Sequence, residues 1–494
     1  MAKVFLNDIR WEYLSDEGRV WLKNHPDPVV TGQVVKESSK RRVVFFPGMY
    51  LKEVHYHGFG VLLKSLGSGT ACKEGRVSRK LAELGICVPQ VIGYGKAASG
   101  GVIRRDVLLT REVAGGKSLF DFLHRDFPRL PCCEKRKFVR RFAAYVRKLH
   151  DAGALHADLH VGNILLVAEG HEFNFVLLDN DRLSLKRGKI STRQRIQNLA
   201  LVLSNLRFHF SRTQYLRFLQ EYGFPPGEKG LAFLSALESK AFAHINKICY
   251  GKAHKCLSNN SRFSKEHRQG FTIYRKSELR TENIIDILLP DPDKVLDRGE
   301  VLKAGRTVQA ASVFIDGQKY FLKRYNDKSF VYRLRNAFRK SRAVRTWFVS
   351  WEFLYRGLPV PEPILCLEER SFRFLKRSYI LYEYVDNSMR LPQKWPLLDT
   401  QTRKSILIRL AIKLDWIHRT GGIHGDLKWN NLLIDENNNI YFIDFDGSRV
   451  SFPGKSQKIA KDLNRFLIDL SKFENDEGLK LIFTKVSNRS GIFF

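Results

Sequence analysis

The stretch His156-Ala-Asp-Leu-His-Val-Gly-Asn163-Ile-Leu-Leu recurs 268 residues further along the chain as His424-Gly-Asp-Leu-Lys-Trp-Asn-Asn431-Leu-Leu-Ile. Both copies have the pattern His-x-Asp-x-x-x-x-Asn followed by an apolar run. A single match of this length is weak evidence, because short motifs often arise by chance. The second copy changes the interpretation, since self-similarity within a chain indicates a duplicated unit.

The sequence on both sides of these stretches repeats in the same order, with offsets between 265 and 272 residues. The matched segments are Met49–Lys52 with Tyr320–Lys323, Gly85–Pro89 with Gly357–Pro361, and Leu177–Asp181 with Phe442–Asp446. These ordered matches predict two homologous domains, residues 1–256 and 281–494. Residues 257–280 are expected to form the linker, because polar and turn-forming residues interrupt the apolar pattern there.

Each half begins with short β-rich runs and continues with helical periodicity. In the second half, Asp316-Gly317 between two such runs indicates a tight hairpin. Apolar residues at helical spacing follow, namely Phe138, Phe142, Val146 and Leu149 in the first half and Leu407, Leu410, Leu414 and Ile417 in the second. This order predicts an α+β fold in two tandem domains, each a small β-rich N-lobe followed by a helical C-lobe.

The repeated residues have the chemistry that phosphoryl transfer needs. That reaction uses a carboxylate near the acceptor hydroxyl, and Asp158 and Asp426 fit this catalytic role. It also uses hard oxygen ligands for Mg²⁺ and a cation on the nucleotide phosphates. The expected metal ligands are Asn163 with Asp179 and Asn431 with Asp444, and the expected phosphate-binding cations are Lys52 and Lys323.

The matched motifs resemble the protein-kinase-like fold and, more narrowly, the bacterial lipopolysaccharide core kinase family, which includes Kdo and heptose kinases. The resemblance covers most of both halves. It is carried by Tyr320-Phe-Leu-Lys323-Arg-Tyr, Gly357-Leu-Pro-Val-Pro361, Tyr379-Ile-Leu-Tyr-Glu383-Tyr, Leu108-Leu-Thr-Arg-Glu112 and His156-Ala-Asp-Leu-His160. It implies two kinase-like domains that use ATP and Mg²⁺. It also implies that Glu112 and Glu383 mark the hinge beside the adenine.

The family pairs its strand lysine with a glutamate from a helix, and here the two halves differ. The resemblance gives that role to Glu74 in the first half, whereas Thr346 stands at the matching position of the second. Glu352, six residues further on, is a weak substitute because it would face another direction of the same helix. The second ion pair is therefore in doubt, and the first domain is expected to be the more active.

Two further residues in each half are expected to support the catalytic loop without taking part in the reaction. His156 and His424 would hold the loop through their ring nitrogens. Asn198 and Asp462, each in a later helix, would support the loop from behind.

The charge balance points to an anionic partner. Lys and Arg total 84 against 51 Asp and Glu, which gives a formal net charge of +33. No nucleic-acid-binding signature is visible, so no nucleic acid is expected. An anionic glycolipid at the inner membrane suits this charge. No apolar run has the length of a transmembrane helix, so the expected location is the cytoplasm, peripheral on the cytoplasmic face of the inner membrane. The oligomeric state is not predicted.

Three functions compete on the sequence. The first is an ATP-dependent kinase that transfers the γ-phosphoryl group to a sugar hydroxyl of the lipopolysaccharide inner core, on Kdo or heptose. The second is a protein Ser/Thr or Tyr kinase. The third is a kinase-like regulatory protein with one inactive domain. Complete Asp, Asn, Asp and Lys sets in both halves favour an enzyme.

Overall fold

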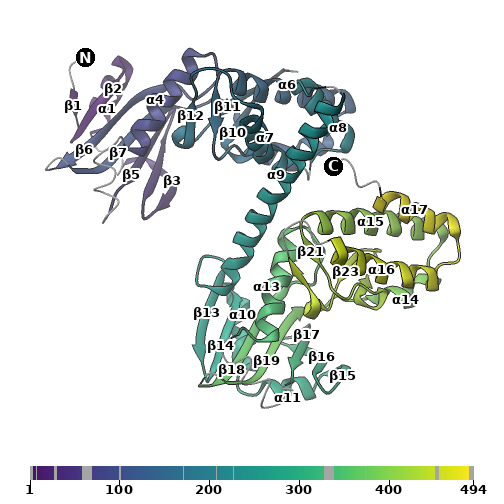
Figure 1. The fold of residues 1–494 in the computed structure, drawn as a ribbon. Coiled ribbons are helices and arrows are strands. Elements are labelled where there is room, and N and C mark those ends of the chain that lie inside the picture. Colours follow the sequence, from purple (N-terminus) through teal and green to yellow (C-terminus); the bar gives the residue numbers. More distant parts are fainter. Residues whose placement is uncertain are drawn as a thin grey trace. The chain divides into compact units, whose positions relative to one another are not determined.

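The chain folds into two compact units, Met1–Ala241 and Phe242–Ile492 (Figure 1). The computed structural model describes residues 4–6, 8–26, 31–57, 69–99, 102–170, 172–206, 209–225, 227–326, 339–372, 374–450 and 456–488. Each unit has a seven-stranded sheet followed in the sequence by a mainly helical part. The expected α+β fold with two tandem domains is confirmed.

The sheet of the first unit has the strand order β1-β2-β6-β7-β5-β4-β3, with the neighbouring strands antiparallel. Its strands are β1 (Val4–Leu6), β2 (Ile9–Leu14), β3 (Gln33–Ser38), β4 (Arg41–Phe46), β5 (Met49–His55), β6 (Val91–Ser99) and β7 (Val102–Arg111). Helix α1 (Asp16–Asn24) follows β2, and helix α4 (Thr70–Glu83) packs on β6 and β7. Buried apolar residues such as Leu51 and Leu109 fill the interior of this lobe.

The helical part of the first unit surrounds a hairpin that bears the repeated motif. Its helices are α5 (Leu119–Arg125), α6 (Cys132–Asp151), α7 (Thr192–Leu206) and α8 (Arg212–Tyr222), and its short strands are β8 (Gly116–Ser118), β9 (Ala154–His156), β10 (Ile164–Glu169), β11 (Glu172–Leu177) and β12 (Leu183–Leu185). The four residues expected at helical spacing in the first half all lie in α6 and are buried. This agreement arises because one apolar face of α6 fills the core of the lobe.

The second unit repeats the sheet with the order β13-β14-β18-β19-β17-β16-β15. The strands are β13 (Phe263–Arg268), β14 (Phe271–Lys276), β15 (Glu300–Ala304), β16 (Val308–Ile315), β17 (Gln318–Tyr325), β18 (Pro363–Ser371) and β19 (Phe374–Glu383). The expected Asp316-Gly317 turn joins β16 to β17, and both residues have positive φ, as this type of turn requires. Helix α13 (Arg342–Tyr355) packs on β18 and β19, as α4 does in the first unit.

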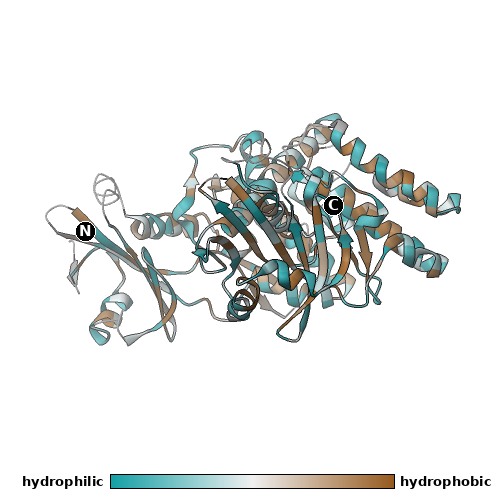
Figure 2. Cartoon of the chain, turned by 90° about the horizontal axis from the view of Figure 1, so that it is seen from below, coloured by the Kyte–Doolittle hydropathy of each residue, from teal (hydrophilic) through white to brown (hydrophobic). Residues whose placement is uncertain are grey.

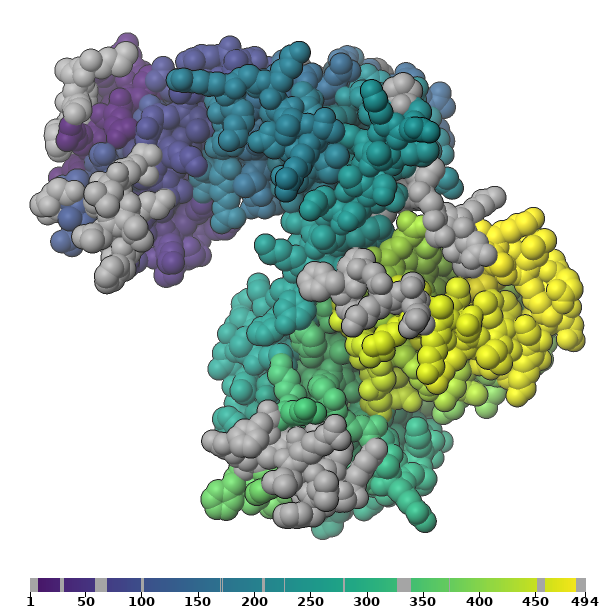
Figure 3. Space-filling model, in the orientation of Figure 1, coloured from purple at the N-terminus to yellow at the C-terminus, as the bar shows by residue number. Residues whose placement is uncertain are grey.

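The remaining elements complete the second unit. They are α10 (Leu279–Leu288), α11 (Pro292–Asp297), α14 (Leu391–Lys394), α15 (Thr400–Arg419), α16 (Ser456–Phe473), α17 (Glu477–Asn488), β20 (Met389–Arg390), β21 (Gly422–Ile423), β22 (Leu432–Ile434), β23 (Ile440–Phe442) and β24 (Arg449–Val450). Helices α16 and α17, in yellow, lie together on the surface drawn in Figure 3. Figure 2 shows hydrophobic and hydrophilic residues interspersed along the helices and strands. Among the helices described, none is long and apolar enough to cross a membrane.

The boundary between the units differs from the expected linker. Residues 257–280 contain β13 and β14, in which Phe263, Phe271 and Ile273 are buried in the second sheet. Residues 242–256, expected in the first domain, lie in the second unit as the end of α9 (Gly227–His254) and the turn after it. Contacts with α13 place them there, since Trp347 donates a hydrogen bond of 3.0 Å to the carbonyl of Cys256.

Candidate active sites

The repeated motif of the first unit forms a loop that is held by its own histidine and asparagine. His156, at the end of β9, donates from Nε2 to the Asp179 carbonyl at 3.2 Å, and its Nδ1 accepts from the Asp158 amide at 3.1 Å. Asn163 donates from Nδ2 to the Asp158 carbonyl at 3.0 Å. Burial lowers the pKa of His156, which favours the neutral ring and a structural role.

The second unit builds the same loop. His424 donates from Nε2 to the Ile443 carbonyl at 3.0 Å, and Asn431 donates to the Asp426 carbonyl at 2.8 Å and to its Oδ2 at 3.2 Å. Burial lowers the pKa of His424 as well. In both loops the asparagine uses its amide nitrogen within the loop, which leaves its amide oxygen for a cation.

Side chains from later helices support both loops, as expected. Asn198 in α7 donates to the His156 carbonyl at 2.7 Å. Asp462 in α16 accepts from the backbone amides of His424 at 2.7 Å and Gly425 at 2.8 Å. The two residues therefore serve the same purpose with opposite hydrogen-bonding chemistry, one as a donor and the other as an acceptor.

The candidate metal ligands of each unit are brought side by side by the backbone. The amide of Leu178 donates to the Asn163 carbonyl at 2.8 Å, and the amide of Ile443 donates to the Asn431 carbonyl at 3.0 Å. The next residues, Asp179 and Asp444, have left-handed backbones with φ of 54° and 65°. Such conformations are uncommon outside glycine and collect at active sites. The loop asparagine and the strand-end aspartate thus form an oxygen pair that suits Mg²⁺ in each unit.

The strand lysine of the first unit is held by two carboxylates. Lys52 is buried, and its Nζ lies 2.6 Å from Oε2 of Glu74 and 2.5 Å from Oδ1 of Asp179. Burial acts against the charge of Lys52, but both carboxylates outweigh it and raise the pKa of Lys52. Burial raises the pKa of Glu74 despite the lysine. Glu74 and Lys52 therefore form the ion pair that the sequence predicts between a helix and a strand.

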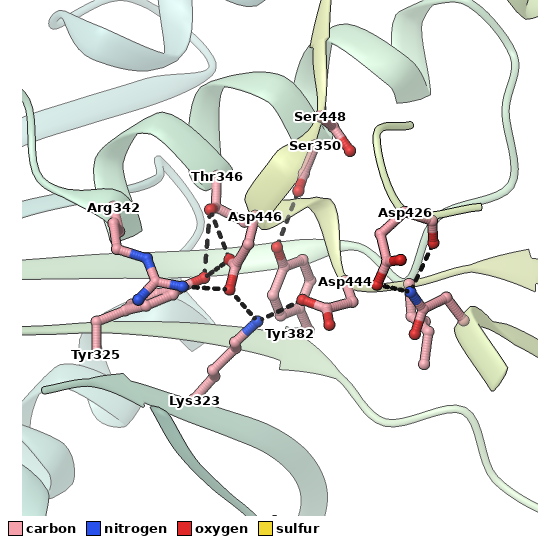
Figure 4. Close-up of polar contacts among 12 residues, drawn as sticks. Lys323, Tyr325, Arg342, Thr346, Ser350, Tyr382, Asp426, Asp444, Asp446 and Ser448 are labelled. Carbon is pink, nitrogen blue, oxygen red and sulfur yellow. Dashed lines mark hydrogen bonds and ion pairs between the residues drawn. The ribbon is translucent and has the colours of Figure 1, made fainter. Parts of the chain in front are cut away.

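The second unit holds its lysine with another acid (Figure 4). Nζ of Lys323 lies 2.8 Å from Oδ1 of Asp444 and 3.0 Å from Oδ2 of Asp446. Thr346, at the Glu74 position, instead donates to Oδ1 of Asp446 at 3.2 Å. The Tyr325 hydroxyl donates to the same oxygen at 2.6 Å. Burial opposes the charge of Lys323, yet Asp446 and Asp444 raise its pKa, so the lysine stays cationic.

Glu352 does not replace the missing helix glutamate. It is buried and forms an ion pair of 3.1 Å with Arg356, one turn further along the chain. This pairing agrees with the expectation that Glu352 faces another direction of the helix, and its carboxylate serves Arg356 rather than Lys323. The first unit has an aspartate equivalent to Asp446, but Asp181 there lies 3.3 Å from Arg41 and does not bind the lysine.

The aspartates expected to face the acceptor also differ in their surroundings. In the first unit, the ion-pair contacts of the Asp158 side chain with other described residues are long, at 3.8 Å to His160 and 3.9 Å to Arg182. In the second unit, Asp426 lies 2.9 Å from Nζ of Lys428 and 2.6 Å from Nη1 of Arg465. Although burial acts the other way, Lys428 and Arg465 lower the pKa of Asp426. This carboxylate is therefore kept ionised.

A cavity of about 680 Å³ opens between the two lobes of the second unit. This volume falls within the range of about 300–1,000 Å³ that is usual for ligand sites. The lining of this cavity is partly polar and partly apolar. The polar lining residues include Lys323, Glu383, Lys428, Asn431 and Asp444, and the apolar or aromatic ones include Ala310, Phe321, Tyr382 and Ile443. Burial raises the pKa of Glu383. In the first unit, Glu112 follows β7 and accepts from the Gly48 amide at 3.2 Å.

Three residues of the second site make contacts that the sequence did not predict. The sequence motifs do not identify Asp446 as a partner of the lysine, and they assign no role to Lys428 or Arg465. Lys428 lies inside the repeated loop motif, two residues after Asp426, and this position could have indicated a contact with the Asp426 side chain. Arg465 and Asp446 act through contacts with residues 39 and 123 positions away, which no local pattern reveals.

Comparisons with known proteins agree with this geometry. The family model described as "Lipopolysaccharide kinase (Kdo/WaaP) family" matches twice, at residues 30–222 and 288–481. The lipopolysaccharide core heptose(I) kinase WaaP of Escherichia coli (strain K12) is 24% identical over 237 residues, which cover 44% of this chain and 88% of that protein. The 3-deoxy-D-manno-octulosonic acid kinase of Xylella fastidiosa (strain 9a5c) is 24% identical over 144 residues, which cover 29% of this chain and 56% of that protein.

A solved structure of WaaP in complex with acyl carrier protein is also similar. It is 25% identical, with a TM-score of 0.37, and the match covers 47% of this chain and 98% of that one.

Proposed function

The chain belongs to the lipopolysaccharide kinase (Kdo/WaaP) family and is a phosphotransferase, and from this premise we propose the reaction and its sites. The proposed reaction transfers the γ-phosphoryl group of ATP to a sugar hydroxyl of the lipopolysaccharide inner core, on Kdo or heptose. Both units carry the Asp, Asn, Asp and Lys set that this reaction uses. The chain is accordingly proposed to have two active sites.

One observation carries the proposal. In the second unit, the phosphate-binding candidate Lys323, the metal candidates Asn431 and Asp444, and the loop residue Lys428 all line one cavity of about 680 Å³. The apolar part of the same cavity suits a purine base, and the polar end suits its phosphates. A nucleotide placed this way has its phosphates beside Asp426, which is in contact with Lys428.

Each residue of the second site is proposed to have a separate role in the reaction. Lys323, kept cationic by two aspartates, would bind the α- and β-phosphates. Asn431 and Asp444 would hold Mg²⁺, which when bound neutralises charge on the phosphates. Asp426, kept ionised by its cations, would orient the acceptor hydroxyl and accept its proton as the phosphoryl group arrives. Lys428 places a positive charge where negative charge develops on the transferred group.

In the first unit the same roles fall to the equivalent residues. They are Lys52 with Glu74 for the phosphates, Asn163 and Asp179 for Mg²⁺, and Asp158 for the acceptor. Glu112 and Glu383 are proposed to mark the adenine end of the two sites. In each unit, one aspartate of the proposed metal pair also binds the lysine, so metal and phosphate binding are coupled through Asp179 and Asp444.

The acceptor is proposed to be an anionic glycolipid at the cytoplasmic face of the inner membrane. The net charge of +33 supports this assignment, because a cationic protein is drawn to acidic lipid and to phosphorylated sugar. The named functions of the E. coli and Xylella fastidiosa relatives, which act on core heptose and on 3-deoxy-D-manno-octulosonic acid, support the sugar as acceptor.

A transfer assay tests the proposal. Purified full-length protein is given radiolabelled ATP with Mg²⁺ and either core glycolipid or a generic protein substrate. Label in the glycolipid and none in the protein is the expected result. Label in the protein substrate alone would make the chain a protein kinase, and ATP binding without transfer to either would make it a regulatory protein. Both of these results overturn the proposal.

A further inference from the structure

The turn between β18 and β19 exposes an aromatic side chain completely. Ser371 pairs with Phe374 across the hairpin, and Phe372 is the first residue after Ser371. Phe372 is fully exposed, and Phe374 is about one third exposed at 37%. A bulky apolar side chain in open solvent gains nothing from the hydrophobic effect, although such side chains dominate the energetics of cores and interfaces.

The backbone of Phe372 is also in an unfavourable conformation. Its φ is 53°, in the left-handed region that L-residues with large side chains rarely occupy. Two-residue hairpins need positive φ in the turn and normally use Asn-Gly or Gly-Gly there. Phe372 therefore lowers stability through its backbone and gains no stability from burial. Backbone strain of this kind often marks a functional site.

The first unit has a different sequence at the same place in its sheet. The equivalent hairpin joins β6 to β7, and Ser99 pairs with Val102 across it. The two residues between them in the sequence are Gly100 and Gly101. The duplicated chain thus has the sequence Ser-Gly-Gly-Val at this place in one copy and Ser-Phe-Arg-Phe in the other. The fold itself does not require an aromatic residue at this place.

Cationic groups accompany the turn. Arg370 donates from Nη2 to the Arg339 carbonyl at 2.7 Å, which brings the exposed residues Arg339 and Lys340 next to the base of the hairpin. Arg373 belongs to the turn in the sequence. An exposed aromatic residue with cations beside it is the combination that binds an anionic membrane surface, because the ring enters the interface while the cations meet the lipid headgroups.

We infer that the β18–β19 turn is a membrane contact in which Phe372 inserts into the interfacial layer of an anionic bilayer. The inference deepens the proposed function, on which it rests for the presence of a lipid-borne acceptor. A lipid surface suits this turn better than a protein does. One phenylalanine offers about 150–250 Å², far less than a stable protein interface of at least about 1,000 Å² needs, whereas a bilayer accepts a single ring without a matching pocket. The charge of +33 favours an anionic surface.

Vesicle binding tests the inference. Full-length wild type, Phe372→Gly and Phe372→Trp are sedimented with phosphatidylglycerol–phosphatidylethanolamine vesicles at several salt concentrations. Phe372→Gly should bind about tenfold or more weakly, as expected for the loss of one buried aromatic side chain. Phe372→Trp should bind as wild type does. The ratio between wild type and Phe372→Gly should persist as salt rises, because burial of a ring is not screened, whereas the affinity of both proteins falls.

Two controls separate this role from a structural one. Phe314→Thr removes another exposed aromatic residue, 73% exposed on β16, and should leave vesicle binding unchanged. The melting temperature of Phe372→Gly should equal or exceed that of wild type, because glycine relieves the strain at positive φ. Equal vesicle affinity of wild type and Phe372→Gly overturns the inference. A dimer that Phe372→Gly dissociates also overturns it, because the partner would then be a second copy.

The outcome is independent of the sugar assay. Phe372→Gly should phosphorylate a water-soluble core oligosaccharide as wild type does, since the turn is not part of either active site. If no sugar is phosphorylated by any variant, the proposed function fails while the vesicle result still stands. If wild type does not bind the vesicles at all, the membrane contact fails and the proposed function is left to its own assay.

Discussion

The two active sites hold the same lysine with different acids. In the first unit, Glu74 on α4 binds Lys52, while Asp181 is occupied by Arg41. In the second, threonine replaces the helix glutamate, and Asp446 moves into contact with Lys323. The strand arginine is missing there as well, because Val308 has the register position of Arg41. Asp446 also forms an ion pair of 3.0 Å with Arg342 of α13, so this aspartate contacts an arginine and the lysine at the same time.

The comparison shows that the essential feature is a carboxylate at the lysine and not the element that supplies it. The expectation that the first domain is the more active rested on the absence of a glutamate at Thr346. Asp446 removes the physical reason for that ranking. The ranking itself stays a prediction, and the experiments below test it from the largest expected effect to the smallest.

The largest effect is expected when both acceptor-facing aspartates are neutralised. Asp158→Asn with Asp426→Asn should lower turnover by about 10²- to 10⁴-fold, the usual contribution of a positioned acid–base group. Each single variant should keep the activity of the other site. Initial rates of phosphate transfer to core glycolipid measure this. Full activity in the double variant would remove both residues from the mechanism.

The next effect concerns stability in the second unit alone. Glu352→Gln leaves Arg356 buried and without its ion-pair partner, which should cost about 3–5 kcal/mol. The rate per folded molecule should not change, because Glu352 does not contact Lys323. Denaturant unfolding gives the stability, and Glu477→Gln, at an exposed pair with Lys480, is the control with little expected change. A lower rate per folded molecule would show that Glu352 contributes to the active site of the second unit.

A third difference between the units predicts a pH effect. His150 in α6 bonds to the neutral Asn198, and burial lowers the pKa of His150 to about 4, whereas the equivalent His418 lies 3.5 Å from Asp462. The unfolded chain has a histidine pKa of about 6.5, so between pH 6.5 and 4 the folded state binds fewer protons. The free energy of unfolding should therefore decrease as the pH is lowered, by about 2 kcal/mol between pH 7 and pH 5.

The variant His150→Gln isolates this contribution. It should be less stable than wild type at pH 7, because one buried hydrogen-bonding group is changed, but its stability should depend less on pH between 7 and 5. Chemical unfolding at each pH, followed by hydrogen exchange in α6, measures the difference. Identical pH dependence in both proteins would show that His150 is not the titrating group.

The smallest effect is expected at the aspartate that the first site does not use for its lysine. In an Asp426→Asn background, Asp181→Asn removes a partner of Arg41 and leaves the ion pair of Lys52 with Glu74 intact. The affinity for ATP should change by no more than about twofold, since the ion pair that is lost does not involve Lys52, which Glu74 and Asp179 still hold. Titration of nucleotide into the protein measures it, and a tenfold loss would mean that Asp181 serves Lys52 indirectly.

The sequence predicts the fold well because the duplication repeats every local signal. The motif loops, the strand lysines and the strand-end aspartates are short-range patterns, and the structure brings them together in each unit. The strands at 263–276 were missed because Lys265, Glu266 and Arg268 make β13 resemble a polar linker. Phe263 is the buried residue of β13, and the other buried residues of this hairpin, Phe271, Ile273 and Tyr274, lie in β14.

The ion-pair partners could not be predicted in the same way. The contacts of Asp446 with Lys323 and Tyr325 join residues more than 120 positions apart, and they depend on how β17 and the turn after β23 meet. The sequence shows only that Thr346 cannot supply a charge. Which acid takes over is decided by the packing of Tyr325, Thr346 and Arg342 around one carboxylate.

The central claim is that Asp446 performs in the second unit what Glu74 performs in the first, and one measurement tests it most directly. The second site is isolated by Asp158→Asn, and kcat/KM for ATP is compared with and without Asp446→Asn. The account predicts measurable transfer in Asp158→Asn and a loss of about 10- to 100-fold on adding Asp446→Asn, as expected for removing a partly buried, charge-assisted contact. Unchanged kcat/KM on adding Asp446→Asn, or no transfer in Asp158→Asn alone, would contradict it.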